Sequence, residues 1–150
     1  MINVGDKAPD FHLPASGGKT VSLHDFKGKT IVLYFYPKDM TSGCTKEACA
    51  FQEALPALSR KKAVVIGVSA DSVLSHEKFA QKNNLRFTLV SDGQKETAKA
   101  YGVWKEKSMY GRKYFGIERT TFVLDKRGVV RHIFPKVKVE GHVQELLKVL

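Results

Sequence analysis

Residues 29–37, KTIVLYFYP, contain an unbroken run of β-branched and aromatic side chains. A strand with one face in water alternates apolar and polar residues, whereas a strand buried on both faces reads as a continuous apolar run. The run therefore predicts a central strand of a sheet covered on both faces. Pro37 should end it, because proline cannot donate a sheet hydrogen bond. A second run, AVVIGVSAD at residues 63–71, predicts another buried strand.

Helical and strand patterns alternate along the rest of the chain. Apolar spacing predicts a helix over 43–61, which Pro56 should kink or shorten, and a helix over 73–85 with Ser72 as its N-cap. The other expected elements are a strand over 86–92, a short helix over 95–103 closed by Gly102, a hairpin over 119–134 turning at Asp125 to Gly128, a helix over 140–150, and a weak hairpin over 11–23. This order fits an α/β fold: a central mixed β-sheet flanked by helices, with an N-terminal hairpin extension. The length predicts a single domain, residues 1–150.

The chain carries 25 Lys and Arg against 15 Asp and Glu, a net charge of +10. Such a balance can indicate a nucleic-acid partner, but these basic residues are scattered, and aromatic side chains do not interleave with them as a base-stacking platform would require. A solvated basic surface explains the charge more simply, so we expect no nucleic-acid partner. A non-catalytic module, either thioredoxin-like or basic and nucleic-acid-binding, stays open as the alternative to an enzyme. Salt-sensitive binding to polyanions would identify it.

The cellular compartment bears on what the two cysteines can do. The start, MINVGDKAPD, has no basic flank followed by an apolar run, and no stretch approaches the ~18 apolar residues of a membrane span. We therefore expect a cytoplasmic protein without membrane contact. In a reducing compartment a structural disulfide between Cys44 and Cys49 is disfavoured, and a catalytic or transient one is favoured.

Cys44 falls where the first strand gives way to a helix. Unpaired backbone N–H groups and the positive end of the helix dipole meet there, so the thiolate of Cys44 should form more readily than that of a free cysteine. Thr41, near the N-cap, can aim its hydroxyl into the same volume, and Gly43 leaves room for a ligand against the backbone. Position alone fits a buried structural cysteine equally well.

Two other thiol chemistries are open at this point. A papain-type cysteine hydrolase needs a histidine base, whereas the histidines of this chain lie in unrelated segments without a recognisable partner: His12, His24, His76, His132 and His142. A metal site would have to combine Cys44, Cys49 and a distant histidine, a set that lacks the usual ligand spacing. We expect neither a metal nor a cofactor.

The pattern Pro37-x-x-x-Thr41-x-x-Cys44 resembles the active-site motif of the peroxiredoxins. With Cys49 five residues after Cys44, it looks like the Q-type, or bacterioferritin-comigratory, branch of that family. The resemblance covers nearly the whole chain, through VGDKAPDF, VVIGVSAD, HEKFAQKNNLRFTLVSD, AYGVW and ERTTFVLD. One departure is Ser42, which stands where this branch usually has proline. The resemblance implies a thioredoxin-like fold and a thiol-dependent peroxidase for hydrogen peroxide and organic hydroperoxides.

The resemblance implies a role for each residue around the thiol. Cys44 would attack the peroxide O–O bond as a thiolate and become a sulfenic acid. Thr41 and the backbone N–H groups of Gly43 and Cys44 would bind the peroxide, and Pro37 would shield the pocket from water. Without the resemblance, Thr41 reads equally well as a plain N-cap and Pro37 as a strand terminator.

The resemblance also assigns a pair of charged side chains to the site. Arg119 would hold the Cys44 thiolate and the leaving oxygen, a task that suits a permanently charged, forked donor. Glu47 would orient Arg119. Taken alone, Arg119 is an ordinary strand-edge arginine and Glu47 a glutamate favoured by the helix dipole.

Cys49 would resolve oxidised Cys44 as an intramolecular disulfide. Five residues along an ideal helix separate Cα atoms by roughly 8 to 9 Å, and a disulfide needs them closer than ~7 Å. The pair therefore suits a bond that forms only after the first helical turn unwinds. The resemblance implies that thioredoxin or a glutaredoxin-like dithiol then reduces this bond, in a protein that is a monomer or a weak dimer.

Overall fold

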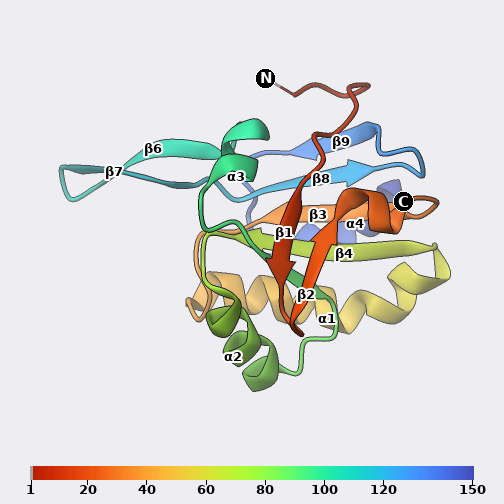
Figure 1. The fold of residues 1–150 in the computed structure, drawn as a ribbon, viewed down its shortest axis with the longest axis horizontal. Helices are drawn as coiled ribbons and strands as arrows, with labels where there is room; N and C mark the ends of the chain where they lie inside the picture. The colour runs from red at the N-terminus through yellow and green to blue at the C-terminus, as the bar shows by residue number, and fades with distance from the viewer. Residues whose placement is uncertain (1) are drawn as a thin grey trace.

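A computed structural model describes residues 2–150 of the chain (Figure 1). β3 (Thr30–Phe35) lies within a seven-stranded sheet with the order β2-β1-β5-β4-β3-β8-β9. It pairs in parallel with β4 (Ala63–Ser69) and antiparallel with β8 (Thr120–Leu124), so the sheet is mixed, as expected.

The outer strands complete this sheet on both sides. β4 pairs in parallel with β5 (Thr88–Ser91), and β8 pairs antiparallel with β9 (Val130–Phe134). The expected N-terminal hairpin is present as β1 (His12–Ala15) and β2 (Lys19–Ser22), and β1 adds to the sheet beside β5. The helices are α1 (Ser42–Arg60), α2 (Val73–Asn83), α3 (Glu96–Ala100) and α4 (His142–Val149), with a 3-10 turn η1 at Leu23–Phe26.

Two apolar cores lie on the two faces of the sheet. Alternate side chains around β3 enter different cores: Ile31, Leu33 and Phe35 belong to one, and Val32, Tyr34 and Tyr36 to the other. The first core also takes Ala98 of α3, and the second takes Phe51 of α1, Phe79 of α2 and Leu146 of α4. Burial on both faces is the physical reason for the unbroken apolar run in the sequence.

The helices differ from expectation at two places. Of the two expected effects of Pro56, a kink or a shorter helix, the second is not found, because α1 continues through Pro56 to Arg60. Pro56 lies on the exposed side of α1, where water can take the carbonyl that lost its helical donor. α3 spans only Glu96–Ala100 and is followed by Gly102 at φ 72°, so it is shorter than expected but closed by the expected glycine.

A second hairpin, for which the sequence pattern indicated nothing, projects from the body of the molecule (Figure 1). It consists of β6 (Trp104–Met109) and β7 (Arg112–Ile117), which form a separate two-stranded sheet. Its turn places Tyr110 and Gly111 at φ 52° and 76°, the backbone of a tight hairpin. Most of its residues are exposed, so neither face imposes an apolar alternation that could be read in advance.

Candidate active site

The C-terminal end of β3 leads directly into the turn that carries the candidate nucleophile. Pro37 follows the strand and is half-buried, and Thr41 is the N-cap of α1, with extended backbone angles (φ −79°, ψ 154°). Cys44 therefore lies in the first turn of a 19-residue helix, among backbone N–H groups that lack helical acceptors. Its side chain is buried, with 2% exposure.

Arg119 reaches this turn because of the register between β8 and β3. Phe35, the last residue of β3, lies opposite Thr120, the first residue of β8. Arg119 precedes Thr120, so it lies beyond the same end of the sheet, where α1 begins. The backbone carbonyl of Arg119 accepts a hydrogen bond from the N–H of Val137 at 2.9 Å. This bond holds the backbone of Arg119 against the segment that follows β9.

The Arg119 guanidinium bridges two side chains of α1. Nη2 lies 3.3 Å from Cys44 Sγ, and Nη1 donates to Glu47 Oε1 at 2.6 Å. Cys44 and Glu47 are three residues apart, so one helical turn presents both to the same side. The arginine side chain is 18% exposed and the glutamate 1%, so bulk water screens this pair little. The expected contacts among Arg119, Glu47 and Cys44 are therefore present.

Proton binding at the two charged groups differs. Burial raises the pKa of Glu47 to about 7, against the opposing effect of Arg119. Within residues 2–150, Glu47 Oε2 has no hydrogen-bond partner. Burial opposes the charge of Arg119, but Glu47 and Cys44 outweigh it and raise the pKa of Arg119. The arginine thus stays charged, while the glutamate exchanges a proton near neutral pH.

Gly43 and Thr41 also lie beside the thiol. A Cβ on residue 43 would sit 3.3 Å from Arg119 Nη2, so the missing side chain leaves space for the guanidinium. The Thr41 hydroxyl donates to the carbonyl of Lys38 at 2.9 Å and makes no capping bond to the helix. A hydroxyl that donates in this way keeps its lone pairs to accept a hydrogen bond from a hydroperoxide.

Cys49 lies further along the same helix. It is half-buried, and its Sγ lies 3.9 Å from Asn83 Oδ1 at the end of α2. Both cysteines are free thiols, and α1 is continuous from Ser42 to Arg60. The structure thus holds the thiols in the intact helix from which the disulfide cannot form directly.

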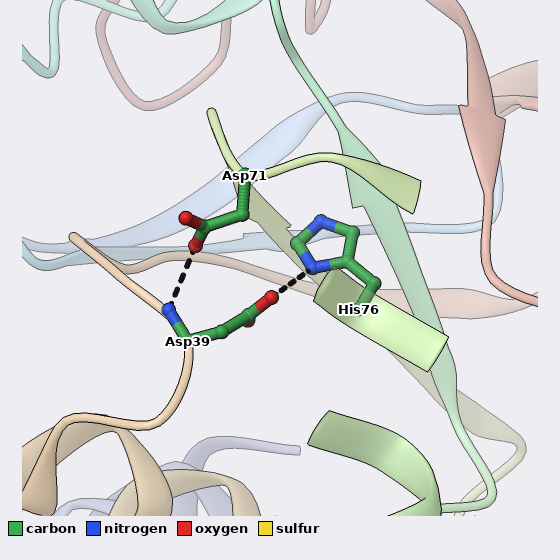
Figure 2. Close-up of side chains that lie close together, drawn as sticks. All are labelled: Asp39, Asp71 and His76. Carbon is green, nitrogen blue, oxygen red and sulfur yellow. Dashed lines mark hydrogen bonds and ion pairs between the residues drawn. The ribbon is translucent and has the colours of Figure 1, made fainter. Parts of the chain in front are cut away.

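The expectation that no histidine has a recognisable partner is wrong for His76. Its Nδ1 lies 2.7 Å from Oδ2 of Asp39, in the loop that precedes Cys44 (Figure 2). His142 Nε2 lies 2.8 Å from a buried threonine hydroxyl. Neither histidine contacts the thiol: within residues 2–150 the hydrogen-bond partner of Cys44 Sγ is Arg119. The histidine base of a papain-type hydrolase is therefore not in place.

Two further side chains lie near the site, and no pattern in the sequence marked them as functional. The buried hydroxyl of Tyr34 has no partner within residues 2–150, and burial, followed by the charge of Glu47, raises the pKa of Tyr34 well above its ordinary value. Lys107 of β6 donates to the carbonyl of Ile117 at 2.5 Å. Burial and the charge of Arg119 lower the pKa of Lys107. Lys107 comes from the hairpin that the sequence pattern did not predict. Tyr34 was expected only to be part of the buried strand over residues 29–37.

Comparison with known proteins gives the family. The model of the AhpC/TSA family matches residues 4–133. The putative peroxiredoxin bcp of Coxiella burnetii is 53% identical over 146 residues, which cover 97% of each chain. Peroxiredoxin Bcp of Bacillus subtilis is 51% identical over 149 residues, 99% of this chain and 95% of that protein.

Solved structures agree with these relatives. A cysteine-to-serine variant of Xylella fastidiosa PrxQ superposes with a TM-score of 0.94 at 39% identity, over 99% of this chain and 95% of that one. The bacterioferritin comigratory protein of Xanthomonas campestris, studied for alkyl peroxide reduction, gives a TM-score of 0.88 at 44% identity, over 93% and 88%. The non-catalytic alternative is therefore wrong. This chain belongs to the AhpC/TSA family and is a Q-type peroxiredoxin, a thiol peroxidase with a thioredoxin-like fold.

Proposed function

We propose that Cys44 is the peroxidatic cysteine of this enzyme and Cys49 its resolving cysteine. The observation that carries the proposal is the Arg119 bridge, with 3.3 Å to Cys44 Sγ and 2.6 Å to Glu47 Oε1. The Cys44 thiolate attacks one oxygen of the hydroperoxide, and the O–O bond breaks. Sulfur is oxidised to the sulfenic acid, and the other oxygen leaves as an alkoxide or hydroxide that takes up a proton.

The neighbours of Cys44 divide the work of this step. Arg119 stabilises the charge on the sulfur before the reaction and on the departing oxygen as the bond breaks. The Thr41 hydroxyl accepts from the hydroperoxide, and the N–H groups of Gly43 and Cys44 donate to it. Glu47 holds Arg119 in place, and Pro37, half-buried at the end of β3, limits the access of water.

Disulfide formation completes the cycle on the protein. After the first turn of α1 unwinds, the Cys49 thiolate attacks the sulfenic sulfur, the S–O bond breaks as the Cys44–Cys49 bond forms, and the hydroxide that leaves takes up a proton to become water. Thioredoxin or a glutaredoxin-like dithiol returns both thiols by exchange. Hydrogen peroxide and organic hydroperoxides are the proposed substrates, since the Xanthomonas relative was studied for alkyl peroxide reduction.

The proposal extends to the state of the whole protein. Residues 1–150 act as a single domain, in the cytoplasm, as a monomer or weak dimer, without a metal, cofactor or nucleic-acid partner. Among residues 2–150, no helix has both the length and the apolar character that a bilayer span requires.

The test is peroxide-dependent NADPH consumption with thioredoxin and thioredoxin reductase, using hydrogen peroxide and cumene hydroperoxide. Cys44→Ser should abolish turnover. Cys49→Ser should consume about one equivalent of peroxide and then stop, because no internal disulfide forms for thioredoxin to reduce. Wild-type turnover by the Cys49→Ser variant would show that Cys49 is not the resolving residue, and turnover by Cys44→Ser would overturn the whole assignment.

A further inference from the structure

Asp39, in the loop between β3 and α1, is a buried acidic side chain with 4% exposure. Its Oδ1 accepts from the hydroxyl of Tyr36 at 2.5 Å, and its Oδ2 accepts from Ser75 Oγ at 2.8 Å. Oδ2 also lies 2.7 Å from His76 Nδ1, and the Asp39 N–H donates to Asp71 Oδ2 at 2.7 Å (Figure 2). Asp39 is therefore fixed through both carboxylate oxygens and through its backbone.

The contact between Asp39 and His76 is a hydrogen bond between two buried side chains. His76 Nε2 lies 2.9 Å from the carbonyl of Val90, which can only accept, so Nε2 donates to it. Burial opposes ionisation of Asp39, but hydrogen bonds from His76 and Tyr36 outweigh it and lower the pKa of Asp39. Both side chains are almost fully inaccessible, at 0% and 1% exposure, so water cannot replace their hydrogen bond if one partner is removed.

The same geometry argues against a metal ion between these side chains. Ligand atoms of Asp39, Asp71 and His76 all lie within 4.8 Å of one another, close enough to suggest a cation site. However, Asp71 Oδ2 already accepts from the Asp39 N–H and from Ser69 Oγ. His76 Nδ1 faces Asp39 and Nε2 faces the carbonyl of Val90, so both ring nitrogens already have hydrogen-bond partners. The three side chains therefore hold the loop in place, as an anchor, through hydrogen bonds with one another and with the backbone.

The residue that follows Asp39 shows what the anchor holds. Met40 has φ 67°, the left-handed region, and is 46% exposed. A methionine there is strained, so it persists only where its flanks fix the backbone. Asp39 is one flank, and Thr41, the N-cap of α1, is the other. The anchor thus fixes the backbone that places Thr41 and, three residues later, Cys44.

We infer that the Asp39–His76 hydrogen bond, with Ser75, is a positioning element for peroxide reduction, which ties the active-site loop to α2. The inference rests on the proposed role of Cys44. It makes the two half-reactions respond in opposite ways to a weaker anchor. Peroxide cleavage needs Thr41 and Cys44 correctly placed relative to Arg119, so a weaker anchor slows it. Disulfide formation needs the start of α1 to unwind, so a weaker anchor does not slow it.

Two substitutions of His76 separate the anchor from simple packing. In His76→Gln the amide nitrogen lies near the position of Nε2, so the bond to Val90 remains and the bond to Asp39 is lost. In His76→Asn the amide nitrogen lies near the position of Nδ1, so the bond to Asp39 remains and the bond to Val90 is lost. Asn is the smaller replacement, so a loss of packing alone would impair His76→Asn more, whereas the loss of the contact with the loop would impair His76→Gln more.

The measurement is a single turnover of the reduced full chain with hydrogen peroxide, followed by quenching and mass analysis. It gives the second-order rate of Cys44 oxidation and the first-order rate of disulfide formation separately. His76→Gln should slow oxidation about 10- to 100-fold, the scale of a displacement of about 1 Å at the reacting groups, while His76→Asn stays within about threefold of wild type. Neither should slow disulfide formation. Equal oxidation rates in the two variants would overturn the inference.

A second pair of variants, at half-buried or exposed positions, keeps the test independent of folding. Ser75→Ala removes one donor to Asp39, whereas Ser72→Ala removes the N-cap bond to the Ser75 N–H (3.1 Å) without touching Asp39. Only Ser75→Ala should slow Cys44 oxidation, by a few-fold. If the two variants behave alike, the anchor has no part in positioning. Cys44→Ser, run alongside, reports on the proposed peroxidatic role by itself, because its oxidation should vanish whatever the anchor does.

Discussion

The two cysteines of this peroxiredoxin share one helix but have unlike surroundings. Cys44 is buried in the first turn of α1, where Arg119, from the junction of β7 and β8, lies 3.3 Å from its sulfur. Cys49 is half-buried and has a weak contact, 3.9 Å, with the neutral side chain of Asn83. The proposed site of peroxide cleavage is therefore assembled in the resting fold, and the proposed site of disulfide formation is not.

This contrast has a chemical reason. Breaking the O–O bond needs donors already aimed at the place where charge develops, since they gain most when no reorganisation is required. Attack of one thiol on a sulfenic acid needs mainly that the two sulfur atoms meet. A rigid environment at Cys44 and a free one at Cys49 thus match the demands of two successive reactions.

Removing the Arg119 bridge should give the largest effect. Arg119→Met should slow Cys44 oxidation by about 10²- to 10³-fold, the usual loss on removing one donor to a developing oxyanion. Arg119→Lys should fall between Met and wild type, because an ammonium keeps the charge but cannot fork to Cys44 and Glu47. Stopped-flow measurement of the second-order rate constant with hydrogen peroxide checks both.

The matched control for Arg119 is Cys49 itself. In a Cys44→Ser background, alkylation of Cys49 by iodoacetamide should change by less than about twofold when Arg119 is replaced, since the thiolate that reacts is far from the bridge. A similar slowing at both cysteines would mean that Arg119 acts on the fold as a whole, and the contrast between the two sites would be lost.

Glu47 should make stability depend on pH, with a sign set by burial. Its pKa is about 7 in the folded protein, above the ordinary 4.5 of a glutamate. The folded protein therefore keeps a proton that the unfolded chain releases between these values. The stability that Glu47 contributes is full below about pH 4.5 and is lost as the pH rises through 7. The loss is about 3 kcal/mol at most.

Urea unfolding of the reduced protein at pH 5 and pH 8 tests this. Glu47→Gln carries no titrating proton, so it should gain stability relative to wild type on going from pH 5 to pH 8. Glu53→Gln, the same change at an exposed position of α1, should show no such gain. A difference between wild type and Glu47→Gln that is equal at both pH values would mean that Arg119 keeps Glu47 ionised throughout.

The sequence predicted those parts of this picture that depend on local pattern. The run at residues 29–37 gave β3 because burial on both faces leaves an unbroken apolar signature. The motif from Pro37 to Cys44 predicted the turn between β3 and α1, because the residues that begin a helix are neighbours in the sequence. The contact of Arg119 with Cys44, across 75 residues, was expected only through the family resemblance, since no local pattern encodes the register of β8 against β3.

Three features of the structure could not be predicted from the sequence, each for a physical reason. The β6–β7 hairpin is exposed on most positions, so burial leaves no period in its sequence. Asp39 and His76 are 37 residues apart, and their contact follows from how α2 packs beside the loop. The shift in the pKa of Glu47 depends on how completely the fold excludes water from one carboxyl, which composition does not determine.

The smallest expected effect, and the most local, is the loss of one helical turn in the disulfide form. The Cα atoms of Cys44 and Cys49 are roughly 8 to 9 Å apart on an ideal helix, beyond the ~7 Å limit of a disulfide. The segment around Cys44 to Cys49, beginning with the first turn of α1, must therefore lose helical structure when the bond forms. The cost is low, because helix ends open at low free energy and Ser42, unlike proline, leaves the preceding backbone unrestricted.

Amide hydrogen exchange of the reduced and peroxide-treated protein measures that change. In the disulfide form, exchange should be at least about tenfold faster at residues 45–50 and unchanged over 55–60, whose helical acceptors lie beyond the opened segment and where α1 packs Leu58 into the core. Peroxide-treated Cys49→Ser forms no such bond and should keep the protection of the reduced protein. If protection of residues 45–50 is equal in both forms, with the disulfide established by mass, the helix accommodates the bond. Cys49 would then be as preorganised as Cys44, and the contrast between the two cysteines would not hold.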